Sequence, residues 1–201
     1  MSNKVYNNLT ELKSDIQKCK KCELHKSRKM AVPGSGPKNA NVILIGEAPG
    51  AEEDTNGKPF CGRGGKLLDK VISNNNLFRK KFYVTNIVKC RPPNNRVPNT
   101  NERNTCQEYL KQEISIIKPK LICILGNTAF NSILGGSEIT KFRGKVVRKN
   151  NLLYFLTIHP AATIYNQKLI DVLKNDIVKL FDLIRDLKNN KEVPIDIEYT
   201  S

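Results

Sequence analysis

Short apolar runs rich in β-branched residues alternate with segments of helical periodicity along this 201-residue chain. Four of these runs have the composition of buried strands, and a further strand precedes the turn "KNN" at 149–151. The four are "NVILIG" (41–46), "KFYVTNIVKC" (81–90), "PKLICILG" (119–126) and "LLYFLTIHP" (152–160). Apolar residues at helical spacing predict helices over 5–18, 62–77, 102–117, 127–135 and 169–187. This alternation predicts an α/β fold, in which a mostly parallel central sheet is flanked by helices on both faces in three layers.

The length suits a single domain, which we expect over residues 1–189. Residues 190–201 lack helical or strand periodicity, and we expect them to form a flexible C-terminal tail. No apolar stretch approaches the roughly 20 residues that span a bilayer, and the N-terminus carries no apolar signal segment. We therefore expect a cytoplasmic protein that does not interact with membranes.

The charge balance indicates an anionic partner. The chain has 34 Lys and Arg against 19 Asp and Glu, which gives a formal net charge of +15. A positive surface attracts polyanions, nucleic acid first, although a basic protein without such a partner would have the same composition. The six cysteines occur without a secretion signal, which argues against a disulfide framework and for metal ligation, catalysis or burial.

Polar side chains follow the ends of several predicted strands. Glu47 follows the first strand, Asn86 lies near the end of the second, and His159 ends the last. Open α/β sheets bind ligands outside the carboxyl ends of their strands, so we expect these residues to share one rim suited to a small, polar, planar ligand. Each also has a structural alternative: Glu47 as a helix N-terminal acid, Asn86 as a turn cap, and His159 as a buried structural histidine.

Four cysteines have the spacing of a metal site. "CKKC" brings two of them together, and the other two follow the second strand and begin the next helix. Four thiolates can bind tetrahedral zinc or an iron–sulfur cluster. The missing second C-x-x-C favours the cluster, and zinc stays open. The candidate ligands are Cys19, Cys22, Cys90 and Cys106.

Five stretches and the four cysteines, taken in order, resemble a family 4 uracil-DNA glycosylase, the bacterial and archaeal type that carries a [4Fe–4S] cluster. The stretches are "GEAPGAEED", "GKPFCGRGGKLL", "TNIVKCRPPNNRVP", "ITKFRGK" and "HPAA". The resemblance implies a monofunctional, monomeric DNA-repair glycosylase. It would hydrolyse the N-glycosidic bond of uracil in single- or double-stranded DNA and leave an abasic site for base excision repair. The alternative is a non-catalytic iron–sulfur or zinc module that binds nucleic acid.

The resemblance also assigns roles to individual residues. Glu47 and His159 would be catalytic, Asn86 would read the uracil edge, and Phe60 would stack on the base. Asp54 is the acid of "EED" that we expect nearest the pocket. The turn that grips the base would contain Gly46, Ala48, Pro49 and Gly50. The cluster ligands would be the four cysteines named above. Independently of the resemblance, basic residues near this rim are candidates for phosphate contacts, namely Arg63, Lys66 and Arg143. Ile164 or Tyr165 would fill the gap that the flipped base leaves.

Overall fold

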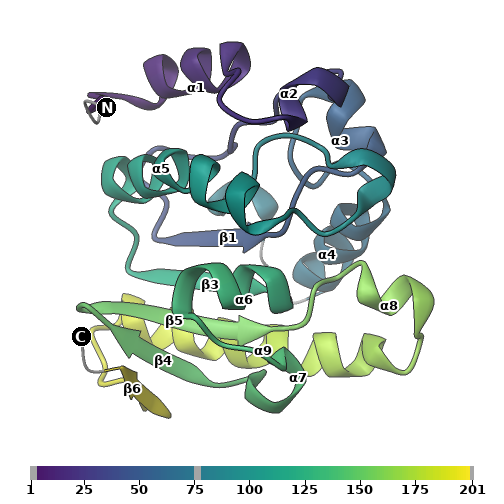
Figure 1. Cartoon of the computed structure of the whole chain (residues 1–201). Coiled ribbons are helices and arrows are strands. Elements are labelled where there is room, and N and C mark those ends of the chain that lie inside the picture. The colour runs from purple at the N-terminus through teal and green to yellow at the C-terminus, as the bar shows by residue number, and fades with distance from the viewer. Residues whose placement is uncertain (1–3, 75–77, 200–201) are drawn as a thin grey trace.

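The computed structural model describes residues 4–74 and 78–199, and in those residues a six-stranded sheet is surrounded by helices (Figure 1). The strands are β1 (Val42–Gly46), β2 (Tyr83–Asn86), β3 (Leu121–Leu125), β4 (Val146–Lys149), β5 (Leu152–Thr157) and β6 (Ile197–Tyr199). The helices are α1 (Leu9–Lys18), α2 (Leu24–Ser27), α3 (Ala51–Asn56), α4 (Arg63–Ser73), α5 (Thr100–Ile117), α6 (Asn127–Leu134), α7 (Ile139–Phe142), α8 (Ala162–Tyr165) and α9 (Leu169–Lys188). The short 3₁₀ turns are η1 (Arg79–Lys81) and η2 (Pro93–Asn95).

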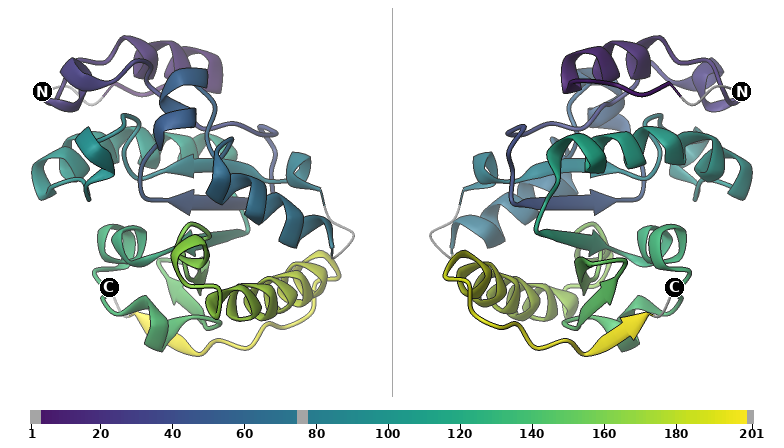
Figure 2. Two further views of the ribbon diagram at one scale, coloured as in Figure 1. Left: turned by 90° about the vertical axis from the view of Figure 1, so that its right-hand side faces the viewer. Right: turned by 90° about the vertical axis from the view of Figure 1, so that its left-hand side faces the viewer.

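The sheet confirms the predicted three-layer α/β fold. Its strand order is β2-β1-β3-β5-β4-β6, and β2, β1, β3 and β5 are parallel neighbours. Successive strand residues face opposite layers: Ile43 and Ile45 pack with α1, α5 and α6, whereas Val42 and Leu44 pack with α4 and α9. Figure 2 shows α5 and α9 on opposite sides of the strands. Both faces of the central strands are therefore buried, which explains their continuous apolar sequences.

The predicted pair of strands around "KNN" is a β-hairpin. β4 and β5 are antiparallel, with Lys149 opposite Leu152. Asn150 and Asn151 connect them with φ values of 50° and 62°. A two-residue hairpin turn with two positive φ angles matches strand twist, and asparagine tolerates that conformation better than most residues. β5 thereby returns to the sheet and directs the following segment, including His159, to the edge where β1 ends.

The C-terminal segment differs from the flexible tail expected over 190–201. β6 pairs with β4, Val193 is buried, and the Asp196 side chain accepts a hydrogen bond of 2.7 Å from the Val146 backbone N–H. A three-residue strand has too little periodicity to be found by pattern, because its pairing depends on an edge strand about 50 residues earlier. Residues 200–201 lie outside the described residues.

The helix expected over 62–77 corresponds to α4, and residues 75–77 lie outside the described part of the chain. None of the helices in residues 4–74 and 78–199 has both the length and the apolar content needed to cross a bilayer.

Candidate active site

A cavity of about 510 Å³ opens at the carboxyl ends of the parallel strands. The arrowheads of β1 and β5 point to this edge, where α3, α4 and α8 lie (Figure 1). The loop after β1, the end of β2, the N-terminus of α4 and the segment after β5 all contribute to its wall. The predicted residues that line it are Glu47, Ala48, Pro49, Gly50, Phe60, Arg63, Asn86, His159, Ile164 and Tyr165.

Three side chains converge on Gly46, the last residue of β1. A Cβ atom at Gly46 would lie 2.6 Å from Phe60 Cζ, 2.7 Å from Asn86 Oδ1 and 3.2 Å from His159 Nε2. Gly46 is also the register partner of Asn86 in the β1–β2 pair. The absence of a side chain at this position therefore lets an aromatic ring, an amide and an imidazole approach one another.

Asn86 carries an unused acceptor. Its side chain is buried, with 2% of the residue exposed, and Oδ1 has no hydrogen-bond partner among the described residues. Leaving a buried polar group unpaired costs about 1–3 kcal/mol, so such groups are uncommon in folded proteins. A ligand with an N–H donor, placed beside Gly46, would satisfy this oxygen.

The tautomer of His159 follows from its neighbour. The Ala161 backbone N–H donates to His159 Nδ1 at 3.2 Å, so Nδ1 is unprotonated and Nε2 carries the hydrogen of the neutral ring. Burial lowers the pKa of His159 from 6.5 to about 4, which keeps the imidazole neutral at pH 7. Its ring lies 5.9 Å from the Phe60 ring at an interplanar angle of 28°. His159 therefore presents an N–H donor at the cavity wall.

Glu47 has a partner that sequence reasoning missed. Thr128, in the first turn of α6, donates its hydroxyl to Glu47 Oε2 at 2.5 Å. The Val88 backbone N–H also donates to the Glu47 carbonyl at 3.2 Å, which ties the loop after β1 to the segment after β2. The only sequence signal for Thr128 is its place just after a third strand end, in "LGNTA".

The acids of "EED" divide into different roles. Glu53 accepts from the Gly50 N–H at 3.1 Å and from the Gly62 N–H at 2.8 Å, so its carboxylate joins two loops of the cavity wall. The expectation that Asp54 would touch the pocket is wrong. It is buried outside the cavity lining, and its Oδ1 accepts from the backbone N–H groups of Lys29 (3.0 Å) and Met30 (3.4 Å). Helical periodicity turns Asp54 towards the N-terminal segment.

Two of the residues predicted to contact DNA, Lys66 and Arg143, form ion pairs within the protein. Lys66 forms an exposed ion pair of 2.9 Å with Glu52. The guanidinium of Arg143 is bonded to the fully buried Asp176, with Nε–Oδ2 at 2.8 Å, and a phosphate contact by Arg143 stays a prediction. Thr157 donates to the same carboxylate at 2.7 Å. Arg143 thus neutralises an internal carboxylate, a role that depends on a partner 33 residues away.

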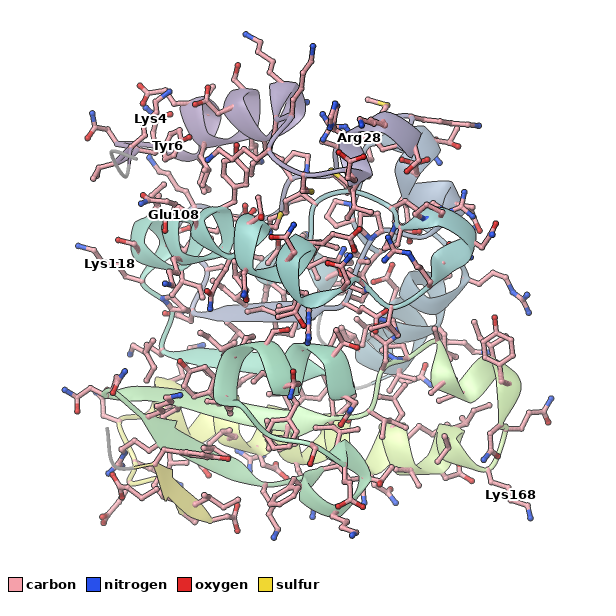
Figure 3. The ribbon with its side chains drawn as sticks, in the orientation of Figure 1. Lys4, Tyr6, Arg28, Glu108, Lys118 and Lys168 are labelled. Atoms are coloured by element: carbon pink, nitrogen blue, oxygen red, sulfur yellow. The ribbon has the colours of Figure 1, made fainter. Side chains whose placement is uncertain are left out.

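All four candidate cysteine ligands line one small cavity between the N-terminal segment and α5. Arg28, labelled in Figure 3, donates to Cys90 Sγ at 2.8 Å, and the Lys89 backbone N–H donates to Cys106 Sγ at 3.3 Å. Within the described residues, no group of three or more His, Cys, Asp or Glu side chains is arranged to hold a single metal ion. Burial raises the pKa of the Cys90 thiol, and the Arg28 guanidinium opposes that shift.

The donor set fits a larger group than one ion. Each thiolate of a [4Fe–4S] cluster binds a different iron. The four cysteine sulfurs therefore lie around the whole cluster and need not converge on the position of a single ion. N–H groups that donate to sulfur, together with a nearby cation, stabilise thiolates in such sites. Four cysteines, an Arg28 guanidinium and backbone donors at one cavity therefore suit an anionic iron–sulfur centre.

The parallel strand ends of this α/β sheet carry a carboxylate, an unpaired amide oxygen, an aromatic ring and a neutral imidazole. These groups define the class of site, which is a pocket for a planar, polar ring beside hydrolytic groups. The family model described as the uracil DNA glycosylase superfamily matches residues 33–182. The chain belongs to this superfamily.

Relatives named Type-4 uracil-DNA glycosylase align with most of this chain and over most of their own length. The one from Sulfurisphaera tokodaii is 42% identical over 87% of this chain and 84% of its own length. The one from Archaeoglobus fulgidus is 38% identical, over 87% and 92% respectively. The one from Thermotoga maritima is 37% identical, over 88% and 95%. The chain therefore belongs to the type-4 group of the superfamily.

Proposed function

We propose that this protein hydrolyses the N-glycosidic bond of deoxyuridine in DNA, releasing uracil and leaving an abasic site for base excision repair. The observation that carries the proposal is the convergence of Asn86, Phe60 and His159 on Gly46 at the strand ends. The type-4 relatives support the same activity. A base can reach such a pocket only when its nucleotide is turned out of the helical stack.

Asn86 would read the uracil edge. With the amide in this orientation, Oδ1 would accept from uracil N3–H, and the amide nitrogen would donate to O4. This contact would satisfy the unpaired buried oxygen. Phe60 would cover one face of the ring, and the turn of Ala48, Pro49 and Gly50 would close the wall beside it. Cytosine lacks the N3 hydrogen, so it would leave Oδ1 unpaired.

The bond-breaking step would use two groups, one for the negative charge that develops on uracil and one for the positive charge that develops on the sugar. As the C1′–N1 bond breaks, its electron pair moves into uracil and gathers on N1 and O2. Nε2–H of neutral His159 would donate to O2 and stabilise that charge. Glu47, held by Thr128 through one oxygen, would stabilise the positive sugar and orient the water that adds to C1′. The Glu47 carboxylate would accept the proton that this water loses, and uracil would leave as the anion and be protonated by solvent.

DNA would approach across the cavity mouth. Arg63 begins α4, where the helix N-terminus also attracts phosphate. Tyr165 is 91% exposed at the rim beside Ile164, and either side chain could fill the gap that the displaced base leaves. Lys66 would add positive charge near the same helix start. The monomeric state and the cytoplasmic location stay predictions.

The four cysteines would hold a [4Fe–4S] cluster, a cofactor that the family resemblance implies and the donor set suits. Bound there, the cluster would supply cross-links between the N-terminal segment, the loop after β2 and α5. Hydrolysis needs no electron transfer, so we assign it a structural role. Purified protein should be brown, and Cys106→Ser should lose the visible absorbance and lower the thermal midpoint. Colourless protein with stoichiometric zinc would contradict this assignment.

The activity test uses a labelled oligonucleotide with one uracil, followed by alkali to cut abasic sites. The wild-type protein should give strand scission, whereas Glu47→Ala and His159→Ala should be slowed by about 10² or more. Asn86→Asp, nearly isosteric, should also be slow, because a carboxylate cannot donate to O4. The same oligonucleotide with cytosine is the control. Binding without scission by the wild type would favour a non-catalytic nucleic-acid-binding module and end the proposal.

A further inference from the structure

The backbone at Phe60 adopts a conformation that must be held from outside. Its φ is 54°, in the left-handed region that favours glycine, although the residue is aromatic and buried. A bulky residue persists there only when its surroundings fix it. The conformation matters to the pocket, because it points the Phe60 ring towards Gly46 and His159.

Arg79, in η1, fixes this segment through two consecutive carbonyls. Its Nη2 donates to the Pro59 carbonyl at 2.5 Å, and its Nη1 donates to the Phe60 carbonyl at 2.6 Å. The guanidinium also lies 5.7 Å from the centre of the Phe60 ring. A planar fork can bond two acceptors at once, which a lysine ammonium cannot do with the same geometry.

Helix α4 completes the support. Asp69 on α4 accepts from Arg79 Nη1 at 3.1 Å and so orients the guanidinium. From the same helix, Gly65 packs directly against the Phe60 peptide: a Cβ there would lie 1.8 Å from the Phe60 carbonyl oxygen. The carbonyl is thus confined by Arg79 and by the α4 backbone.

We infer that Arg79 is a positioning residue for base recognition, which holds the Phe60 ring in its stacking position before the base enters. The inference rests on the proposed function. Arg79 is outside the lining of the base cavity, so it acts through Phe60 and does not touch the base. Preorganising the ring removes an ordering cost that uracil binding would otherwise carry.

The test is a double-mutant cycle on uracil affinity. Free uracil is titrated calorimetrically into the intact protein, with its cluster where one is bound, so the readout needs no turnover. Arg79→Ala should weaken uracil binding by about tenfold or more, and Arg79→Lys by less. In a Phe60→Ala background, Arg79→Ala should add less than about twofold, because the ring it positions is gone.

The matched control is Arg103→Ala. Arg103 is also part-buried and bonded, to Asn131 at 2.8 Å, but lies outside the base cavity and should leave uracil affinity unchanged. Equal losses with and without Phe60, or no loss from Arg79→Ala, would overturn the inference. Should Arg79→Ala not fold, Arg79→Lys enters the same cycle. Wild-type protein that binds uracil without scission would reject the proposed function alone, and wild type that neither binds uracil nor gives scission would reject both.

Discussion

The buried ion pair of Lys89 and Glu113 lies between β2, which contains Asn86, and the cavity lined by the four candidate cysteine ligands. Lys89 and Glu113 are 1% and 0% exposed, and their charged atoms are 2.7 Å apart. Lys89 Nζ also donates to Thr85 Oγ1 at 2.5 Å and to the Asn86 carbonyl at 2.8 Å. Glu113 accepts in addition from the Gly34 N–H and the Tyr83 hydroxyl, at 2.9 and 3.2 Å. Lys89→Met would remove the cation and leave the carboxylate buried.

The expected cost follows from this burial. Removing one partner of a buried pair costs about 3–5 kcal/mol, because the remaining charge is uncompensated. In a domain of 150–250 residues, 1 kcal/mol shifts the melting midpoint by roughly 2–4 °C, so we expect a decrease of about 6–20 °C. The hydrogen bonds that Glu113 keeps from Gly34, Tyr83 and Thr85 place the expected value towards the lower end.

The assay is thermal unfolding by circular dichroism, at fixed pH and with visible absorbance recorded to follow the cysteine site. Lys174→Met is the matched control, since Lys174 and its partner Asp171 form an exposed pair worth about 0–1 kcal/mol. Lys89→Met/Glu113→Gln should recover part of the lost stability, because no charge stays buried. If the melting midpoint of Lys89→Met decreases no more than that of Lys174→Met, the reasoning is refuted.

Three further predictions concern the site. Because burial lowers the pKa of His159 to about 4 from 6.5, the single-turnover rate should show no break near pH 6.5. His159 should also contribute a loss of stability as pH falls from about 6.5 towards 4, since only the unfolded state then binds its proton; a rate that halves near pH 6.5 and vanishes below would contradict this. Gly46→Ala should slow uracil release by about 10² or more, because its methyl group would lie 2.6 Å from Phe60 Cζ. Gly135→Ala, with nothing within 4 Å of the added carbon, should lower stability because its φ is 74°, but should keep wild-type rates in the same assay. Thr128→Val should lower kcat about tenfold at unchanged uracil affinity, because one donor to Glu47 is lost; a change in affinity alone would argue against Thr128 acting through Glu47.

Patterns local in the chain predicted the main elements of the fold, but not the edge strand β6. Apolar strand runs and helical spacing predicted the parallel sheet, both of its faces and the hairpin at Asn150 and Asn151. The strand ends also brought Glu47, Asn86 and His159 to one cavity, since parallel strands end at a common edge. These features depend on side-chain period and strand direction, which neighbouring residues in the sequence encode.

Side-chain partnership was decided by the tertiary structure. Arg143 and Asp54 carry the charges expected of site residues, yet each is bonded elsewhere, to Asp176 and to the Lys29 and Met30 backbone. Thr128 shows the reverse, because a residue without a distinguishing motif contacts Glu47 across 81 positions of the chain.

The sequence by itself thus determined the main architecture and which edge of the sheet carries the site, because both follow from apolar β-branched runs, the helical period of 3.6 residues and strand direction. The tertiary structure alone decided which charged groups face the cavity, how His159 is protonated and what holds Phe60 in a left-handed conformation. The physical reason is that hydrogen bonds and burial depend on groups far apart in the chain, whose contacts no local pattern records.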